Sequence, residues 1–186
     1  MVVTMIKKWL KRFVYRLRGE YTVEKLIEMG LTVGKNFNPQ LGVNLDPSHC
    51  WLIKIGDDVT MAPHVQILAH DAGMYAYVGH TKLGRVEIGN HVFIGAGSIV
   101  LPGVTIGSDV VIGAGSVVTH SIPDGFVYAG NPACKICSTK EYIAKHRQLM
   151  EHRPVWDEHY TLRKNIDVTK KQEQWDSLAD GAGYVE

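Results

Sequence analysis

The sequence predicts a mainly β solenoid closed by helices at both ends, and two features of one repeat predict it. An apolar side chain returns every six residues over two stretches of the chain. These side chains are Ile55, Met61, Ile67, Ile88, Ile94, Val100, Ile106, Ile112 and Val118. Glycine commonly follows them, as at Gly56, Gly89 and Gly95, and each such glycine would cost about 1 kcal/mol inside a helix. Very short strands separated by tight corners satisfy both features.

Composition limits the class of protein. The chain has 186 residues, 45% of them hydrophobic and 21% charged, which fits one compact domain with short extensions. A formal net charge of +1 gives no reason to expect a nucleic-acid partner. Three cysteines, Cys50, Cys134 and Cys137, cannot all pair and favour a reducing compartment. Because no signal peptide and no run of about 18 apolar residues occurs, we expect a cytoplasmic protein.

Residues 1–30 are expected to form an N-terminal helical arm and cap. Residues 1–18 carry apolar side chains three and four positions apart, opposite six basic side chains and no acidic one. The apolar stripe is Ile6, Trp9, Leu10, Phe13, Val14 and Leu17. Two interpretations stay open: this helix packs on the solenoid or a neighbouring subunit, or it makes peripheral contact with anionic lipid at the inner face of the membrane. A second short helix is expected from Thr22, as N-cap, to Gly30.

Residues 31–133 are expected to form the solenoid. If each hexapeptide is one side of a triangular prism, its apolar residue points inward and stacks on the equivalent residue 18 positions later. Ile88 and Ile106 then form one internal ladder, and Ile94 and Ile112 form another. The corners between sides need small residues or residues with positive φ, which explains the glycines. The stretch GKNFNPQLGVNLDPSHC matches the period only loosely, so the register of the first coil stays open.

One interruption of the repeat predicts a loop. Eighteen residues per coil would place the next equivalent of Ile55 at position 73, yet it occurs at Ile88. About 15 residues, 71–85, therefore leave the prism as a protruding loop with His70 at its root. Loops that project from a rigid solenoid commonly carry function, so this corner is the first place to look for a site.

Residues 134–186 are expected to form a C-terminal helix and tail. The repeat ends after Pro132, and the segment 138–141, Ser-Thr-Lys-Glu, is typical of a capping box. We expect a helix from there to about His152, ended by Pro154. The tail has only weak periodicity, and its aromatic residues indicate a packing contact: Trp156, Tyr160 and Trp175.

The six-residue pattern is the signature of the left-handed parallel β-helix, and residues 31–133 resemble the hexapeptide-repeat acyltransferases. The strings that carry the resemblance are WLIKIGDDVTMAPHVQILAHD, VEIGNHVFIGAGSIVLPGVTIG and VIGAGSVVTHSIPDGFVYAGNPA. They look like the group that contains maltose, galactoside and capsular or lipopolysaccharide sugar O-acetyltransferases. The resemblance implies transfer of an acetyl group from acetyl-CoA to a sugar hydroxyl in capsule, lipopolysaccharide or exopolysaccharide biosynthesis, with no metal required.

The resemblance also implies catalytic roles. His70, within the string ILAHD, matches the catalytic histidine of the family. A hydroxyl attacks a thioester poorly unless its proton is removed as the bond forms, and a neutral imidazole suits that transfer. The backbone N–H of Ala96 matches a donor to the developing oxyanion. Asp71 is a candidate to orient His70, although neighbouring side chains on a strand point in different directions.

In relatives, acetyl-CoA lies in a groove between neighbouring prisms, which implies a homotrimer. Matching by position gives the cofactor-binding candidates Phe93, Gly95, Ala96, Ala114, Thr119, His120 and Lys135. Relatives frequently have a basic residue just after the string GNPA for the 3′-phosphate of coenzyme A. Here Cys134 and Cys137 occupy that region, so Lys135 or Lys140 is the candidate for this contact.

The resemblance to capsule and lipopolysaccharide enzymes implies a saccharide acceptor, and a lipid-linked one would account for the basic arm; aromatic faces and carboxylates near the loop are the candidates to bind it. The candidates are Asp46, Trp51, Asp71, Tyr75, Tyr77 and His80. Serine or xenobiotic O-acetylation is an alternative within the same reaction class. A non-catalytic trimeric β-helix scaffold is an alternative of another class, and the presence of His70 argues against it.

Two patterns give weaker signals for a metal. Cys134 and Cys137 form a C-x-x-C spacing without the second pair that a zinc site needs. Four histidines raise the question of a metal site between subunits, as in the γ-class carbonic anhydrases that share this fold: His49, His64, His80 and His91. His64 and His70 are six residues apart and so lie on different faces of the prism. We therefore expect those four histidines to be exposed or locally hydrogen-bonded.

Overall fold

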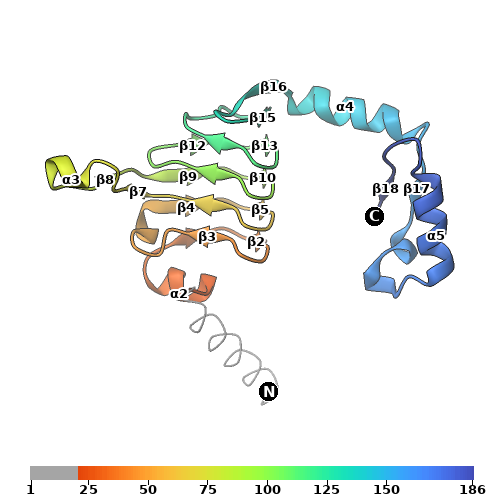
Figure 1. Cartoon of the computed structure of the whole chain (residues 1–186), viewed down its shortest axis with the longest axis horizontal. Coiled ribbons are helices and arrows are strands. Elements are labelled where there is room, and N and C mark those ends of the chain that lie inside the picture. The colour runs from red at the N-terminus through yellow and green to blue at the C-terminus, as the bar shows by residue number, and fades with distance from the viewer. Residues whose placement is uncertain (1–20) are drawn as a thin grey trace, which may run out of the picture. The chain divides into compact units, whose positions relative to one another are not determined.

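The computed structural model describes residues 21–186, which form two compact units, 21–139 and Lys140–Glu186. The first unit is a solenoid of very short strands (Figure 1). The helix expected within residues 1–18, and both interpretations of its apolar stripe, lie outside the described residues. Over residues 21–186, no helix is long and apolar enough to cross a membrane.

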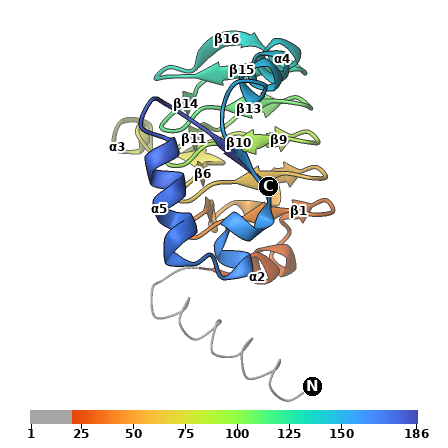
Figure 2. The ribbon, with the colours of Figure 1, turned by 90° about the vertical axis from the view of Figure 1, so that its right-hand side faces the viewer.

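The solenoid consists of three sheets whose stacked coils are seen from two sides in Figures 1 and 2. The first sheet has the order β1 (Thr32–Val33), β4 (Ile53–Ile55), β9 (Val86–Ile88), β12 (Thr105–Ile106). The second has the order β2 (Asn38–Pro39), β5 (Thr60–Met61), β10 (Phe93–Ile94), β13 (Val111–Ile112), β15 (Phe126–Ala129), β16 (Cys134–Ser138). The third has the order β3 (Asn44–Leu45), β6 (Gln66–Ile67), β11 (Ile99–Val100), β14 (Val117–Val118). Successive strands along the regular coils fall in different sheets, so the chain winds around one core.

The strand register confirms the predicted internal ladders. Ile88 pairs with Ile106, and Ile94 pairs with Ile112 on the neighbouring coil, all in parallel strands. Every apolar residue of the six-residue repeat is buried, and so are the second apolar positions of the hexapeptides: Val59, Val65, Val92, Val104 and Val110. Burial of each such side chain contributes roughly 1.5–3 kcal/mol, so the ladders supply the driving force for stacking.

Close approach of the coils explains the glycines at the corners. A Cβ atom on Gly95 would lie 2.4 Å from the backbone nitrogen of Ala114 on the next coil, where only backbone could move aside. Gly97 has a φ of 68°, in the left-handed region that disfavours a side chain. The corner geometry expected from the sequence is therefore present at these two positions.

A short helix lies beside the first coil. Helix α2 (Val23–Glu28) begins where the backbone nitrogen of Lys25 donates to Thr22 Oγ1 at 3.2 Å, which confirms Thr22 as the N-cap. Leu26 is the side chain that α2 buries in the core of the solenoid. The helix thus covers the apolar end of the coil stack.

Cys50 belongs to this buried end. It begins the 3₁₀ turn η1 (Cys50–Leu52), is fully buried, and its Sγ lies 3.6 Å from the carbonyl oxygen of Leu26. Burial raises the pKa of the Cys50 thiol, which keeps it protonated at neutral pH. Cys50 is therefore a packing residue, whereas Cys134 is exposed and Cys137 is half-buried.

One further strand follows the last coil of the solenoid. After residue 133, where the sequence places the end of the β-helix, Cys134–Ser138 forms strand β16, which pairs antiparallel with β15. The six-residue repeat has no signal for this strand, because a reversed strand uses the free edge of β15 instead of adding a coil. Helix α4 (Thr139–Met150) follows, two residues shorter than the helix expected to reach His152.

The second unit, Lys140–Glu186, contains the remainder of α4 and several short elements. They are β17 (Val155–Trp156), η2 (Glu158–Tyr160), η3 (Leu162–Lys164), α5 (Val168–Ser177) and β18 (Tyr184–Val185). Strands β17 and β18 pair in parallel, and the Tyr184 hydroxyl lies 3.0 Å from His146 Nδ1. The rings of Trp156 and Tyr160 contact each other, while Trp175 on α5 is 77% exposed. Two of the three aromatic residues of the tail, Trp156 and Tyr160, thus pack against each other within this unit.

Candidate active site

The predicted loop leaves the solenoid where the repeat is interrupted. Ile55 pairs directly with Ile88, so the residues between β6 and β9 include an insertion. Within it, β7 (His70–Asp71) and β8 (Lys82–Leu83) pair antiparallel, and the short helix α3 (Tyr75–Val78) forms the tip, shown in yellow at the left of Figure 1. At the base, the backbone nitrogen of Gly84 donates to the carbonyl oxygen of Ala69 at 3.0 Å. His70 therefore sits at the base of a two-stranded arm.

A shorter insertion lies at the same corner one coil earlier. Asn44 pairs with Gln66, four positions beyond the regular spacing of 18 seen between Phe93 and Val111. The additional residues fall between β3 and β4, in the segment 46–52 that contains η1. Both insertions occur where the chain passes from the third sheet to the first, so their residues are neighbours in space.

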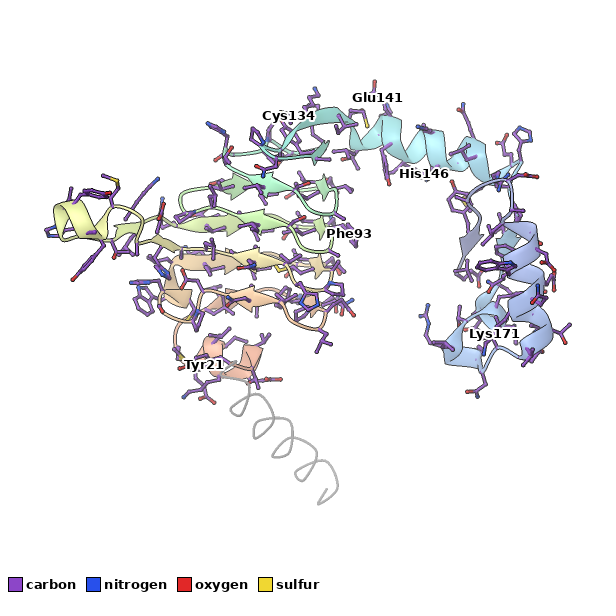
Figure 3. All side chains as sticks on the ribbon, viewed as in Figure 1. Tyr21, Phe93, Cys134, Glu141, His146 and Lys171 are labelled. Carbon is purple, nitrogen blue, oxygen red and sulfur yellow. The ribbon has the colours of Figure 1, made fainter. Side chains whose placement is uncertain are left out.

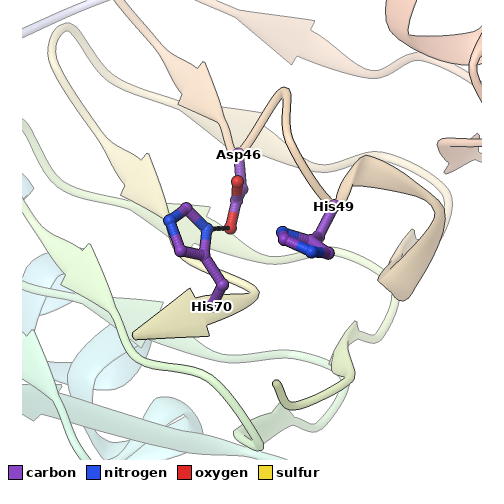
Figure 4. Close-up of side chains that lie close together, drawn as sticks. All are labelled: Asp46, His49 and His70. Atoms are coloured by element: carbon purple, nitrogen blue, oxygen red, sulfur yellow. Dashed lines mark hydrogen bonds and ion pairs between the residues drawn. The ribbon is translucent and has the colours of Figure 1, made fainter. Parts of the chain in front are cut away.

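The two insertions bring Asp46 and His70 together. Because Leu45 pairs with Ile67, Asp46 follows its strand next to the residues that lead to His70. Asp46 Oδ2 lies 2.6 Å from His70 Nδ1 (Figure 4). The same oxygen accepts from the backbone nitrogen of Ala69 at 2.7 Å. The Asp46 side chain is 1% exposed and that of His70 is 34% exposed. A buried carboxylate thus holds an accessible imidazole.

The Asp46 contact determines which nitrogen of His70 can act as a base. An ionised carboxylate only accepts hydrogen bonds, so the proton of a neutral His70 imidazole lies on Nδ1, which donates to Asp46. Nε2 then carries the lone pair. The Asp46–His70 pair therefore presents a base with a defined tautomer and orientation.

His49 is a neighbour of this pair that the sequence analysis did not place there. Its ring centroid lies 5.1 Å from that of His70 and 5.2 Å from that of Trp51. His49 Nδ1 is buried and has no hydrogen-bond partner, which corrects the expectation of an exposed or locally bonded histidine. The signal that could have located it is the four-residue lengthening of the first coil, which the loose repeat in that stretch hides.

Comparisons with known proteins identify the family. Residues 85–120 match the family model described as bacterial transferase hexapeptide (six repeats). Protein CapG of Staphylococcus aureus is 40% identical over 167 residues, which cover 87% of each chain. The chain belongs to the hexapeptide-repeat acetyltransferases.

Two solved structures of similar acetyltransferases support this membership. A maltose O-acetyltransferase from Clostridium difficile 630 is 44% identical, with a TM-score of 0.52 over 59% of each chain. A hexapeptide-repeat containing acetyltransferase, VCA0836, from Vibrio cholerae O1 biovar eltor, complexed with acetyl coenzyme A, is 28% identical, with a TM-score of 0.52 over 59% of this chain and 61% of that one. The predicted fold class, a left-handed parallel β-helix, and the predicted enzyme class, an acyltransferase, are confirmed.

The structure of this acetyltransferase corrects the role expected for two carboxylates. Asp71 does not orient His70: its Oδ1 accepts from the backbone nitrogen of Gly73 at 2.8 Å, because adjacent side chains of a strand point to opposite faces. Asp46, expected to bind the acceptor, is buried and holds His70 instead. The role of Asp71 in acceptor binding stays a prediction.

The other residues expected to bind the acceptor differ in their exposure and in their contacts. Trp51 is 52% exposed and contacts His49, so it borders the Asp46–His70 pair. Tyr75 and Tyr77 are exposed on α3 at the tip of the arm. His80 is exposed and its Nδ1 lies 2.7 Å from the carbonyl oxygen of Val78. Trp51 is thus linked to the Asp46–His70 pair through the ring of His49.

The cofactor candidates of the acetyltransferase lie on several neighbouring coils of the solenoid. Phe93 lies on the outer face of β10 and is 44% exposed (Figure 3), and Ala96 is exposed at the following corner, next to the buried Gly95. Gly95 approaches Ala114, Thr119 Oγ1 lies 2.8 Å from His120 Nδ1, and the Lys135 ammonium lies over the Phe126 ring.

Replacing Asp46 by asparagine is expected to lower kcat of the acetyltransferase about 10- to 100-fold, with little change in KM for acetyl-CoA. A hydrogen bond to an ionised group contributes roughly 1.5–3 kcal/mol, and a neutral amide stabilises the imidazolium of His70 less than a carboxylate does. Steady-state kinetics check this, with Asp109→Asn as a control because that side chain is exposed. An unchanged kcat would show that the pair does not position the base.

Proposed function

We propose that this acetyltransferase transfers the acetyl group of acetyl-CoA to a sugar hydroxyl on a precursor of capsule, lipopolysaccharide or exopolysaccharide. The observation that carries the proposal is the Asp46–His70 pair, with Nε2 of His70 free at the base of the arm. A saccharide acceptor is supported by the similarity to the maltose O-acetyltransferase. Exposed aromatic rings at Trp51, Tyr75 and Tyr77 offer faces on which a sugar ring can stack.

The reaction follows from the orientation of His70. Nε2 removes the hydroxyl proton as the acceptor oxygen attacks the thioester carbonyl carbon, and Asp46 stabilises the imidazolium that forms. The backbone N–H of Ala96 donates to the resulting oxyanion. Collapse of this intermediate breaks the C–S bond, and the imidazolium returns its proton to the leaving thiolate, so His70 is restored and no acyl-enzyme forms.

The active form is a homotrimer in this proposal. Phe93 is exposed on the outer face of the prism, and the remaining cofactor candidates lie on successive coils. One prism then supplies His70, and its neighbour supplies part of the wall that binds acetyl-CoA, including Lys135 for the 3′-phosphate. Sedimentation equilibrium is expected to give a mass three times the chain mass of 20.7 kDa.

Release of free thiol from acetyl-CoA tests the proposed function across a panel of acceptors. The panel contains maltose, a galactoside, a capsule oligosaccharide, serine and a hydroxylated xenobiotic. The expected result is turnover that depends on a saccharide and is fastest with the oligosaccharide. Faster turnover of serine or of the xenobiotic would replace the sugar acceptor, and absence of both turnover and acetyl-CoA binding would favour the scaffold alternative.

A further inference from the structure

Asp46, His49 and His70 together form a cluster with more donor atoms than the acetyl transfer uses. One donor atom from each side chain lies within 4.8 Å of the other two. Figure 4 shows the two imidazole rings on opposite sides of the Asp46 carboxylate. Within residues 21–186, no other group of three histidine, cysteine or acidic side chains gathers its donor atoms this closely. Residues 1–20 contain no histidine and no cysteine.

Two buried atoms of the cluster lack partners. Asp46 Oδ1 and His49 Nδ1 are both buried and make no hydrogen bond, although Asp46 Oδ2 has two. A buried polar atom without a partner costs about 1–3 kcal/mol, so a cluster that contains two such atoms favours a bound species. One carboxylate and two imidazoles are a ligand set that Zn²⁺ takes in proteins.

We propose that Asp46, His49 and His70 bind a divalent transition-metal ion such as Zn²⁺, and that the bound ion inhibits the enzyme. Zn²⁺ bonds of about 2.0–2.2 Å place two ligand atoms of a tetrahedral centre roughly 3.4 Å apart, so the three donors must shift from their present positions within 4.8 Å of one another, which rotation of the His49 and His70 side chains can supply. His70 is 34% exposed, so the ion has access and keeps a position for water.

We expect inhibition whether the ion binds Nδ1 or Nε2 of His70. The inference of inhibition rests on the proposed function. If Nε2 binds it, the lone pair that removes the hydroxyl proton is occupied. If Nδ1 binds it, the imidazole proton moves to Nε2 and the same lone pair is lost. In both cases His70 Nε2 no longer has the lone pair that accepts the hydroxyl proton.

Calorimetric titration of the metal-free chain with ZnCl₂ tests the site without any assay of activity. The titration is made in a Cys134→Ser, Cys137→Ser background, because these two thiols are accessible and bind zinc. We expect one ion per chain at the cluster. His49→Gln should weaken binding by more than the roughly 10- to 100-fold that loss of an outer-shell partner costs. The matched control is His91→Gln, because His91 also lies near two carboxylates, at 3.5 Å from Asp58 and 3.4 Å from Asp109.

The outcomes separate the site from general histidine binding. Loss of binding in His49→Gln with retention in His91→Gln supports the site, and Co²⁺ should then give the visible absorption of a tetrahedral centre that His49→Gln lacks. Equal affinity in wild type and His49→Gln, or equal loss in both variants, overturns it. If His49→Gln does not fold by circular dichroism, His70→Gln replaces it, because that side chain is partly exposed.

The proposed inhibition by the bound ion needs an assay that Zn²⁺ itself does not disturb. Free coenzyme A binds Zn²⁺ through its thiol, so acetylated product is measured by mass spectrometry. We expect Zn²⁺ to abolish product formation and a chelator to restore it. Full activity with the site occupied overturns inhibition. Failure of the proposed function leaves the calorimetric result intact.

Discussion

Replacing His70 by alanine is expected to lower kcat for acetyl transfer about 100-fold or more. General-base assistance commonly contributes about 10²–10⁴-fold, and His70 Nε2 is the lone pair that the Asp46 contact leaves free. The loss should appear with every acceptor that wild type uses, because proton removal is common to all of them. Steady-state rates from the thiol-release assay measure it.

Two comparisons make the His70 result specific. His91→Ala is the control, because that ring is 64% exposed and pairs with carboxylates on a different corner. The melting temperature of His70→Ala separates loss of catalysis from loss of folding, since the lost side chain is 34% exposed but is a partner of the buried Asp46. A rate within a few-fold of wild type would mean that another group removes the hydroxyl proton.

Replacing Ile94 by alanine is expected to lower the free energy of unfolding by about 2–5 kcal/mol. Ile94 is fully buried and stacks between Met61 on one coil and Ile112 on the next. A cavity in one ladder removes contacts on both sides, because each coil of a solenoid is held only by its neighbours. Urea denaturation at one fixed protein concentration measures the change.

Ile136→Ala is the matched control for Ile94. Ile136 is 62% exposed on β16, so its replacement should change the free energy of unfolding by less than about 0.5 kcal/mol. Comparable losses in both variants would contradict the internal ladder as the main source of stability.

The coils could be predicted from sequence because their rule is local. The apolar residue in every six points into the core, and the small residue after it allows the corner between two sides of the prism, as Ile94 and Gly95 illustrate. The arm could be predicted as well, because its length breaks a regular count between Ile55 and Ile88. His70 followed from the arm together with the family resemblance.

The partner of His70 could not be predicted because it depends on the register of an irregular coil. Four additional residues between β3 and β4 move Asp46 opposite the base of the arm, and the weak repeat in that stretch gives no count from which to infer this. Asp71 was the candidate nearest in sequence, but strand geometry directs it away from His70. For the same reason, the sequence did not indicate that Asp46 contacts His70 or that His49 lies beside the pair.

The position of the two insertions has a consequence for how this enzyme can diverge. Both lengthen the same corner, from the third sheet to the first, while strands on either side keep their pairing: Leu45 with Ile67, and Ile55 with Ile88. Length and sequence can therefore change at this corner without a shift in the ladders. In the proposed function this edge binds the acceptor, so acceptor preference can change there while the buried interior of the scaffold stays the same.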